Sequence, residues 1–291
     1  MRIQDNATQT ESQDWTLVIK PRNSLFDLNL REVWQYKDLL WLFVRRDFVA
    51  QYKQTVLGPL WNLAQPILTT LMFLLVFGKI ANIPTDGIQP VLFYMSGITI
   101  WNYFSVCLTN TSNTFVANAA IFGKVYFPRL VIPLSIVVSN LVRFMIQFAL
   151  LAAAMIYYNF KGYPLHITWH ILLIIPTILL MAGIGLGLGI IISSLTTKYR
   201  DFTVLMTFAI QLLMYATPIA YPLSFLNHSR YKAIILLNPL TPVTELFRYS
   251  IFGKGTVTTG NICYSTAFVI ICLALGSVIF TRVEKTFMDT V

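Results

Sequence analysis

The stretch Leu30–Gln65, LREVWQYKDLLWLFVRRDFVAQYKQTVLGPLWNLAQ, passes from a charged segment into a long apolar run. On a helical projection its charged part separates into a basic side and an aromatic and aliphatic side. The separation is imperfect, because Leu42 lies among the charges and Asp47 lies on the apolar side. A helix of this kind, with little net hydrophobicity, is typical of a membrane surface. The pattern predicts an amphipathic helix over residues 31–55, ended by Gly58-Pro59 where the chain enters lipid; a helix packed on a soluble core is the alternative.

The composition is that of a membrane protein. Of 291 residues, 56% are hydrophobic and only 11% are charged, against about 25% charged residues in soluble domains, and the mean hydropathy is +0.66. The net charge of +9 would suit nucleic acid, but the charges lie between apolar runs and not on one patch. Anchoring of the cytoplasmic loops explains them better, so no nucleic-acid partner is expected. The three cysteines lie in apolar runs without metal-ligand spacing and predict neither a metal site nor disulfides.

Apolar runs of about 20 residues predict membrane-spanning helices. The predicted fold is an all-α polytopic membrane protein with six transmembrane helices in a domain over residues 56–281. Lys and Arg are concentrated in the connections on the side of the two termini, which places both termini in the cytoplasm. A polar tail over residues 1–30 lacks the apolar segment of a cleavable signal peptide, and residues 282–291 form a cytoplasmic tail. The six predicted spans are residues 57–78, 91–112, 131–157, 169–195, 202–222 and 260–281.

The connection before the last predicted span, residues 223–259, is not a simple loop. It contains two short, partly apolar helical pieces, at about 229–237 and 242–252, each too short to span. Such pieces suit re-entrant or interfacial helices; a surface loop with two amphipathic turns explains the pattern equally well. The helix breakers in and just before this connection are Pro218, Pro222, Pro239 and Pro242.

The sequence lacks the residues that membrane enzymes and ion-driven carriers use. It has no GxxxxGK[ST] phosphate-binding loop, since FGKGT at 252–256 lacks the upstream glycine. No carboxylate lies in the middle of a predicted span, and the three histidines form no metal-binding pattern. Arg143 alone offers an ionisable group at membrane depth, which is too little for a proton relay. A transporter of this composition takes its energy from another subunit; a lipid-linked sugar transferase and a passive channel are the alternatives from other classes.

Polar side chains recur at helical spacing on four predicted spans. Each set follows an interval of three or four residues and forms one stripe. The stripes predict a wet path lined by hydroxyls and amides, with aromatic rings against sugar faces; hydrogen bonding between packed helices is the alternative. The glycines of MAGIGLGLGII in the fourth span instead predict close packing, within the subunit or across a dimer. The candidate residues of the substrate path are Asn62, Tyr94, Trp101, Asn102, Tyr103, Ser105, Thr109, Arg143, Gln147 and Tyr215.

Six stretches, in order along the chain, resemble the membrane subunit of ABC-2 type exporters, in the branch that exports polysaccharides and polyol phosphates (O-antigen, capsule and teichoic acid permeases). The resemblance is specific to the family and not to one polymer. The stretches are RRDFVAQYKQTVLGPLWNLAQP (45–66), FGKVYFPRLVIPLS (122–135), SSLTTKYRDF (193–202), MYATPIAYPLS (214–224), NPLTPVTELFRYSIFG (238–253) and VEKTFMDTV (283–291).

The resemblance implies a homodimer in the bacterial inner membrane, paired with two ATPase subunits that bind ATP and Mg. This chain would be a permease subunit, not an enzyme, and would bind no cofactor itself. The implied substrate is an undecaprenyl-linked, O-antigen-like polysaccharide that moves from the cytoplasmic to the outer face. Another lipid-linked polymer, such as teichoic acid or capsule, or a small amphiphile, is the alternative substrate.

The resemblance also implies roles for particular segments. The helix at 31–55 would contact the ATPase, the connections at 118–130 and 196–201 would complete the coupling surface, and the pieces at 229–252 would be gate helices. The gate candidates are Pro218, Pro239, Glu245 and Arg248. The coupling candidates are Arg45, Arg46, Asp47, Lys53, Lys124, Arg129, Lys198, Arg200 and Asp201.

Overall fold

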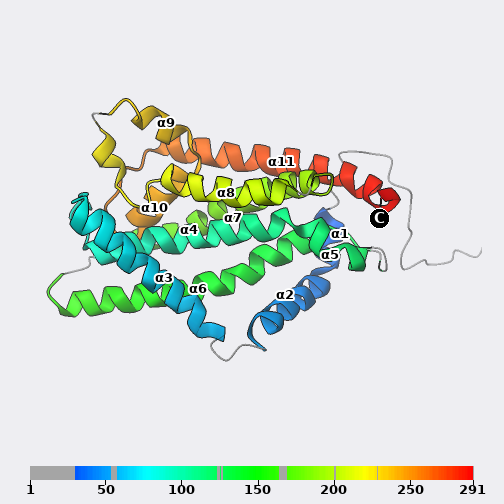
Figure 1. Cartoon of the computed structure of the whole chain (residues 1–291), viewed down its shortest axis with the longest axis horizontal. Helices are drawn as coiled ribbons and strands as arrows, with labels where there is room; N and C mark the ends of the chain where they lie inside the picture. Colours follow the sequence, from blue (N-terminus) through cyan, green and yellow to red (C-terminus); the bar gives the residue numbers. More distant parts are fainter. Residues whose placement is uncertain are drawn as a thin grey trace, which may run out of the picture.

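The computed structural model describes residues 30–53, 58–122, 125, 127–163, 169–199, 201–227 and 229–290. Within these residues every regular element is a helix. Figure 1 shows an elongated bundle in which α4, α6, α7, α8 and α11 run along the long axis. One end of the bundle carries α9 and α10 and is called the α10 end; the other carries α1 and α5 and is called the α5 end. The elements are α1 (Leu30–Gln35), α2 (Lys37–Tyr52), α3 (Gly58–Phe73), η1 (Leu74–Ile80), α4 (Pro90–Ser112), α5 (Thr114–Phe122), α6 (Val131–Phe160), η2 (Trp169–Leu173), α7 (Ile174–Thr196), α8 (Phe202–Tyr215), η3 (Leu223–Leu226), α9 (Lys232–Leu237), α10 (Leu240–Phe252) and α11 (Thr259–Thr290).

Five helical segments of the described chain are long and apolar enough to cross a membrane. They correspond to the first four predicted spans and to the last one. Their bounds are Leu60–Ile80, Pro90–Ser112, Val131–Phe160, Trp169–Thr196 and Thr259–Val283.

The fifth predicted span, residues 202–222, forms a shorter helix than its apolar sequence predicts. α8 covers only 14 residues, which at 1.5 Å per residue reach about 21 Å of the roughly 30 Å hydrocarbon layer. The residues from Ala216 to Tyr221 then form turns and bends. The structure therefore supports five spanning helices and one short apolar helix, and the sixth full span is not confirmed.

The glycine-rich helix α7 lies between α4 and α11 because its glycines admit both neighbours. A Cβ added at Gly183 or Gly187 would lie 2.6 Å or 2.9 Å from side chains of α11. On the α4 side, a Cβ at Gly189 would lie 2.5 Å from the Cβ of Thr111. Small residues thus let the backbones approach closely, and the glycine stripe is confirmed as packing within the subunit.

An aromatic cluster at the α5 end joins α2 to the bundle. The Phe43 side chain of α2 is 6% exposed, and its ring centroid lies 5.8 Å from that of Phe127. Phe127 stacks on Phe122 of α5 at 5.9 Å, and Phe115 of α5 stacks on Phe280 of α11 at 4.5 Å. These rings connect α2, α5, the segment before α6, and α11.

Two predicted short segments differ from expectation in detail. The predicted surface helix at 31–55 is divided into α1 and α2 at Tyr36, whose backbone is not helical (φ −93°, ψ 24°).

In the proline-rich connection, eleven of the thirteen residues of α10 are buried, whereas no residue of α9 is. The burial of α10 contradicts a surface position for this piece, whereas the exposed α9 is compatible with it; re-entrant helices remain a prediction.

Candidate functional site

Polar side chains of three helices remain at the surface of the protomer at the depth of the predicted spans. α4 is the most buried candidate span, yet one of its faces keeps partial exposure. The hydroxyl of Thr203 on α8 donates to the Asn113 side-chain oxygen beyond α4 at 3.4 Å, so the polar edges of α8 and α4 lie side by side. The polar surface comprises Asn62 of α3, Asn102, Ser105 and Thr109 of α4, and Thr207, Gln211 and Tyr215 of α8.

This polar surface is poorly suited to lipid. An amide or hydroxyl that faces hydrocarbon without a partner costs free energy. Some hydroxyls are satisfied within their own helix, as Thr207 is by the carbonyl of Thr203 at 3.1 Å, but the amide of Gln211 and the ring of Tyr215, 62% exposed, stand outside the bundle. The surface therefore suits contact with water or with a second polypeptide.

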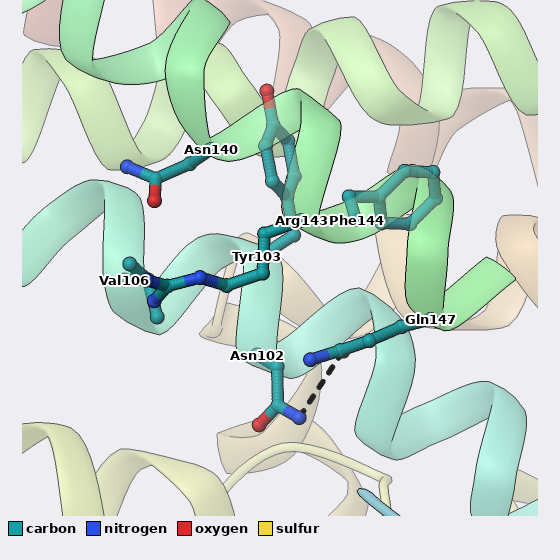
Figure 2. A pocket seen from close by; sticks show the side chains of 7 residues that line it. All are labelled: Asn102, Tyr103, Val106, Asn140, Arg143, Phe144 and Gln147. Carbon is teal, nitrogen blue, oxygen red and sulfur yellow. Dashed lines mark hydrogen bonds between the residues drawn. The ribbon is translucent and has the colours of Figure 1, made fainter. Parts of the chain in front are cut away.

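A closed polar seam joins α4 to α6 beside this surface (Figure 2). The Asn102 side-chain nitrogen donates to the Gln147 side-chain oxygen at 3.3 Å. Arg143 extends from α6 towards Val106 of α4 between the two helices (Figure 2), and Asn140 lies one turn before it. The cavity among these side chains has a volume of about 10 Å³, which is room for about one water molecule. The seam thus matches the alternative of helix packing, and no open path for a glycan runs through it.

Three aromatic rings proposed for the substrate path are buried in the helix core instead. Tyr94, Trp101 and Tyr103 are at most 4% exposed. The ring of Trp101 packs on that of Phe104 at 5.3 Å, and the ring of Tyr103 packs on that of Phe144 at 5.3 Å. A substrate cannot reach these rings in this conformation, because their helices pack directly against each other. The path candidates that keep exposed surface are Asn62, Asn102, Ser105, Thr109, Arg143 and Tyr215.

The coupling candidates on α2 divide between its two faces. Asp47 lies on the inner face, where it accepts a hydrogen bond from Arg46 at 2.9 Å and one from the Ser139 hydroxyl of α6 at 3.5 Å. The position of Asp47 on the apolar side is therefore explained by a contact within the chain. Leu42 and Arg45 lie on the exposed face, which combines apolar and basic side chains.

The remaining coupling candidates lie at or near helix ends. Arg129 places its guanidinium 5.2 Å from the centre of the Phe122 ring, and Lys198 lies 5.3 Å from the Tyr199 ring. Lys53 follows α2, Asp201 precedes α8, and both are exposed. Lys124 and Arg200 lie outside the described residues.

The gate candidates form a buried ionic network at the α10 end. Arg248 is 1% exposed and pairs with Glu245 at 3.2 Å. Its guanidinium donates to the carbonyls of Pro218 and, at 2.8 Å, of Ile219, and it lies 3.8 Å from the centre of the Phe93 ring of α4. Burial lowers the pKa of Arg248 while Glu245 raises it, and an arginine remains charged in either case.

The same network reaches the connection to α11. The second oxygen of Glu245 accepts the backbone N–H of Thr256 at 3.1 Å and its hydroxyl at 3.3 Å. At the start of α10, the Pro239 carbonyl accepts the Ser265 hydroxyl of α11 at 2.8 Å. Arg248 thereby connects α10 to the chain after α8 and to Phe93 of α4. Glu245 connects α10 to the segment that leads into α11.

Asn238 also holds this end together, although the sequence patterns do not single it out. Asn238 donates to the Ala216 carbonyl at 3.1 Å and to the Thr217 hydroxyl at 2.9 Å, and it accepts the N–H of Leu240 at 3.0 Å. Its signal in the sequence is the position of an asparagine just before a helix, where its side chain can cap the first turn. Together, Asn238 and Arg248 fix the chain that follows α8.

Within the described residues, no three His, Cys, Asp or Glu side chains gather as metal ligands would. The arrangement offers packing, hydrogen bonding and charge at three levels of a helical bundle.

Comparison with known proteins identifies the family. The model of the ABC-2 type transporter family matches residues 38–252. The chain is 30% identical to the O-antigen export system permease protein RfbA of Klebsiella pneumoniae, over 87% of this chain and 94% of that protein. It is 26% identical to the RfbA permease of Myxococcus xanthus, over 90% and 98% of the two chains, and 23% identical to the polysialic acid transport protein KpsM of Escherichia coli, over 84% and 93%. This chain belongs to the ABC-2 type transporter family.

Proposed function

We propose that this chain is the permease subunit of an ATP-driven exporter that moves an undecaprenyl-linked, O-antigen-like polysaccharide from the cytoplasmic to the outer face of the bacterial inner membrane. The structural support for the proposal is the polar surface of α3, α4 and α8. In a single protomer this surface would face lipid, to which its polar side chains are poorly suited. The relatives named for O-antigen export supply the class of substrate.

The path lies between two copies of this chain. The α4–α6 seam has no room for a glycan, so a protomer alone does not enclose a path. Two polar surfaces that face each other would enclose one, and would remove the amides of both copies from lipid. Both termini and the α5 end are cytoplasmic in this arrangement, which agrees with the bias of Lys and Arg along the chain.

ATP hydrolysis by two partner subunits drives the cycle. The chain has no phosphate-binding motif of its own, and the exposed face of α2 offers apolar and basic side chains at the α5 end. Because the Phe43 cluster joins α2 to α5 and α11, a force on α2 acts on the bundle directly.

The coupling role is tested by reversing four charges, Arg45→Glu, Arg46→Glu, Lys124→Glu and Arg200→Glu, in one variant. We expect loss of export and of co-purification with the ATPase subunit, while the permease remains in the membrane. Arg230→Glu, at an exposed position of the opposite end of the bundle, is the control for added negative charge. Unchanged export by the four-charge variant rejects the coupling surface.

The path is tested at Thr109, which lies on the polar surface. Thr109→Trp is expected to reduce export and to raise the amount of lipid-linked polymer inside the cell, without loss of assembly. Leu179→Trp, on an apolar and exposed face of α7, is the matched control. If lipid-linked polymer does not accumulate in Thr109→Trp, this stripe serves packing only.

A capsule polymer is the second candidate substrate, because the capsule export protein CtrC of Neisseria meningitidis is also similar, at 23% identity over 86% of this chain. Export of a purified O-antigen intermediate and of a capsule intermediate by the same reconstituted vesicles distinguishes the two.

A further inference from the structure

A groove of about 290 Å³ lies at the α10 end, away from the α4–α6 seam. One wall is α6, with Phe148, Ala152 and Met155; the others are Ile171 and Ile174 at the start of the predicted fourth span, and Ile251 of α10. The volume is roughly ten times the share of one water molecule in the liquid, about 30 Å³. Asn159 is the one polar side chain among the lining residues, so water would find few hydrogen-bond partners there.

The groove has the depth of one bilayer leaflet. Its lining on α6 extends from Phe148 to Phe160, and twelve residues of helix rise about 18 Å. The hydrocarbon layer is about 30 Å thick, so this length exceeds half of it slightly. α6, which forms the long wall, and the segment that holds Ile171 and Ile174 both belong to candidate membrane spans. Lining residues Phe160 and Ile171 are exposed, so the groove opens towards lipid tails.

The mouth of the groove carries the features of a membrane–water interface. Phe160, the last lining residue of α6, is 85% exposed. Tyr157 and Trp169, close in sequence to lining residues, are exposed as well, and aromatic side chains concentrate at this level of a bilayer. Lys161 directly follows Phe160 and holds its ammonium 4.8 Å from the centre of the Tyr157 ring. No Asp or Glu occurs between Asp86 and Asp201 in the sequence, so α6 and α7 carry none, and Glu245 of α10 is buried and paired with Arg248.

We propose that this groove binds one acyl chain of an anionic phospholipid, whose phosphate lies at Lys161. The length of the groove matches that of an acyl chain, and its apolar lining suits the methylene groups of that chain. The cation of Lys161 suits the negatively charged head group. The proposal requires only that the protein lies in a bilayer, and it holds for any exported substrate.

The test uses the full chain reconstituted in vesicles of phosphatidylethanolamine and phosphatidylglycerol at about 3:1. A trace of phosphatidylglycerol with a photoactivatable group on one acyl chain is crosslinked, and labelled peptides are mapped by mass spectrometry. We expect label on the α6 and α7 peptides that line the groove. Ala152→Trp fills the groove and should lower this label at least fivefold, whereas Ala153→Trp, whose site is exposed on the next position of α6, should leave it unchanged.

A second pair of measurements tests the head group without altering the packing. Lys161→Gln should lower labelling by the phosphatidylglycerol probe several-fold and leave labelling by a phosphatidylcholine probe unchanged. Equal labelling of Ala152→Trp and Ala153→Trp overturns the groove as the site. Loss of the phospholipid label on addition of about two mole per cent undecaprenyl phosphate overturns phospholipid as the occupant.

Discussion

Arg248 carries a full positive charge in the interior of the α10 end. Taking an ion pair out of water is costly, and such a pair often contributes little net stability compared with apolar side chains of the same size. The buried pair instead fixes the position of the chain after α8, because the guanidinium of Arg248 donates hydrogen bonds to the two carbonyls there. Gly97 of α4 belongs to this arrangement, since a Cβ there would lie 2.9 Å from a guanidinium nitrogen.

Replacing Arg248 by methionine tests this arrangement. The variant leaves Glu245 buried without its cation and two carbonyls without donors, a loss of about 3–5 kcal/mol in the free energy of unfolding. Thermal unfolding of the purified protein in detergent measures it. Arg230→Met, at an exposed position of the same connection, is the control. Arg248→Met with Glu245→Gln should recover part of the loss, and a double variant no more stable than Arg248→Met contradicts the ion pair as its source.

At the scale of single helices, α7 packs closely on its neighbours because its glycines have no side chains, whereas the attachment of α2 depends strongly on the buried side chain of Phe43. The α7 glycines place its backbone against both α4 and α11. In contrast, α2 lies across the α5 end and is held by few buried side chains, of which Phe43 is the largest. α7 is therefore packed along its length, whereas α2 is held by buried Phe43 and Val44 and by the hydrogen bond between Asp47 and Ser139.

Gly189→Ala should separate α7 from α4. The added Cβ would meet the Thr111 side chain at 2.5 Å, and overpacking of this kind costs about 1–3 kcal/mol. Gly260→Ala is the matched control, because the Cβ there has nothing within 4 Å in the first turn of α11. Unfolding midpoints in a detergent titration should be lower for Gly189→Ala alone; equal midpoints contradict the close approach.

Phe43→Ala should release α2 from the bundle. Removing a buried phenyl ring costs about 3–5 kcal/mol, and here most of that loss falls on the attachment of α2. Hydrogen exchange of the α2 backbone amides should become faster, with little change in α7. Trp41→Ala, on the exposed face of the same helix, should leave exchange unchanged. Slow exchange in Phe43→Ala would mean that other contacts hold the helix.

At the scale of the whole molecule, the protomer leaves the polar surface of α3, α4 and α8 exposed at the depth of the predicted spans. Five helical segments can span the membrane, while α8 is short, exposed and fixed mainly beyond its end by Asn238 and Arg248. Such a helix gains most from a second copy of the chain, since only one of its residues, Ile210, is buried in the protomer.

The proposed dimer predicts crosslinks on α8. In a variant without native cysteines, Gln211→Cys should form a disulfide-linked or reagent-linked dimer in the membrane if the polar surfaces of two copies face each other as proposed. Leu179→Cys, 66% exposed on α7, should remain a monomer on a non-reducing gel. Crosslinking at Leu179→Cys and not at Gln211→Cys would move the interface to the other side of the bundle.

The sequence predicts those features that depend on hydropathy and spacing. Five spans, the glycine packing of α7 and a helical piece in the region of α10 all follow from local patterns. The early end of α8 follows only in part. Pro218 is a local breaker, but the turns over residues 216–221 are held by contacts with Asn238 and Arg248, which come later in the chain. The site could be predicted only in part for the same reason: Tyr94 and Trp101 share the spacing of path residues, and only the positions of neighbouring helices show that they are buried.

The α4–α6 seam has a consequence for the energy source. Arg143 lies twelve residues, about 18 Å, along α6 from Val131, within the electric field of an energised membrane. Moving one charge through the full field amounts to about 2.3 kcal/mol per 100 mV. While the seam stays closed, Arg143 keeps its depth, no charge moves with it, and the membrane potential does no work on this part of the cycle. If α4 and α6 separate during export and Arg143 changes depth, the rate becomes voltage-dependent.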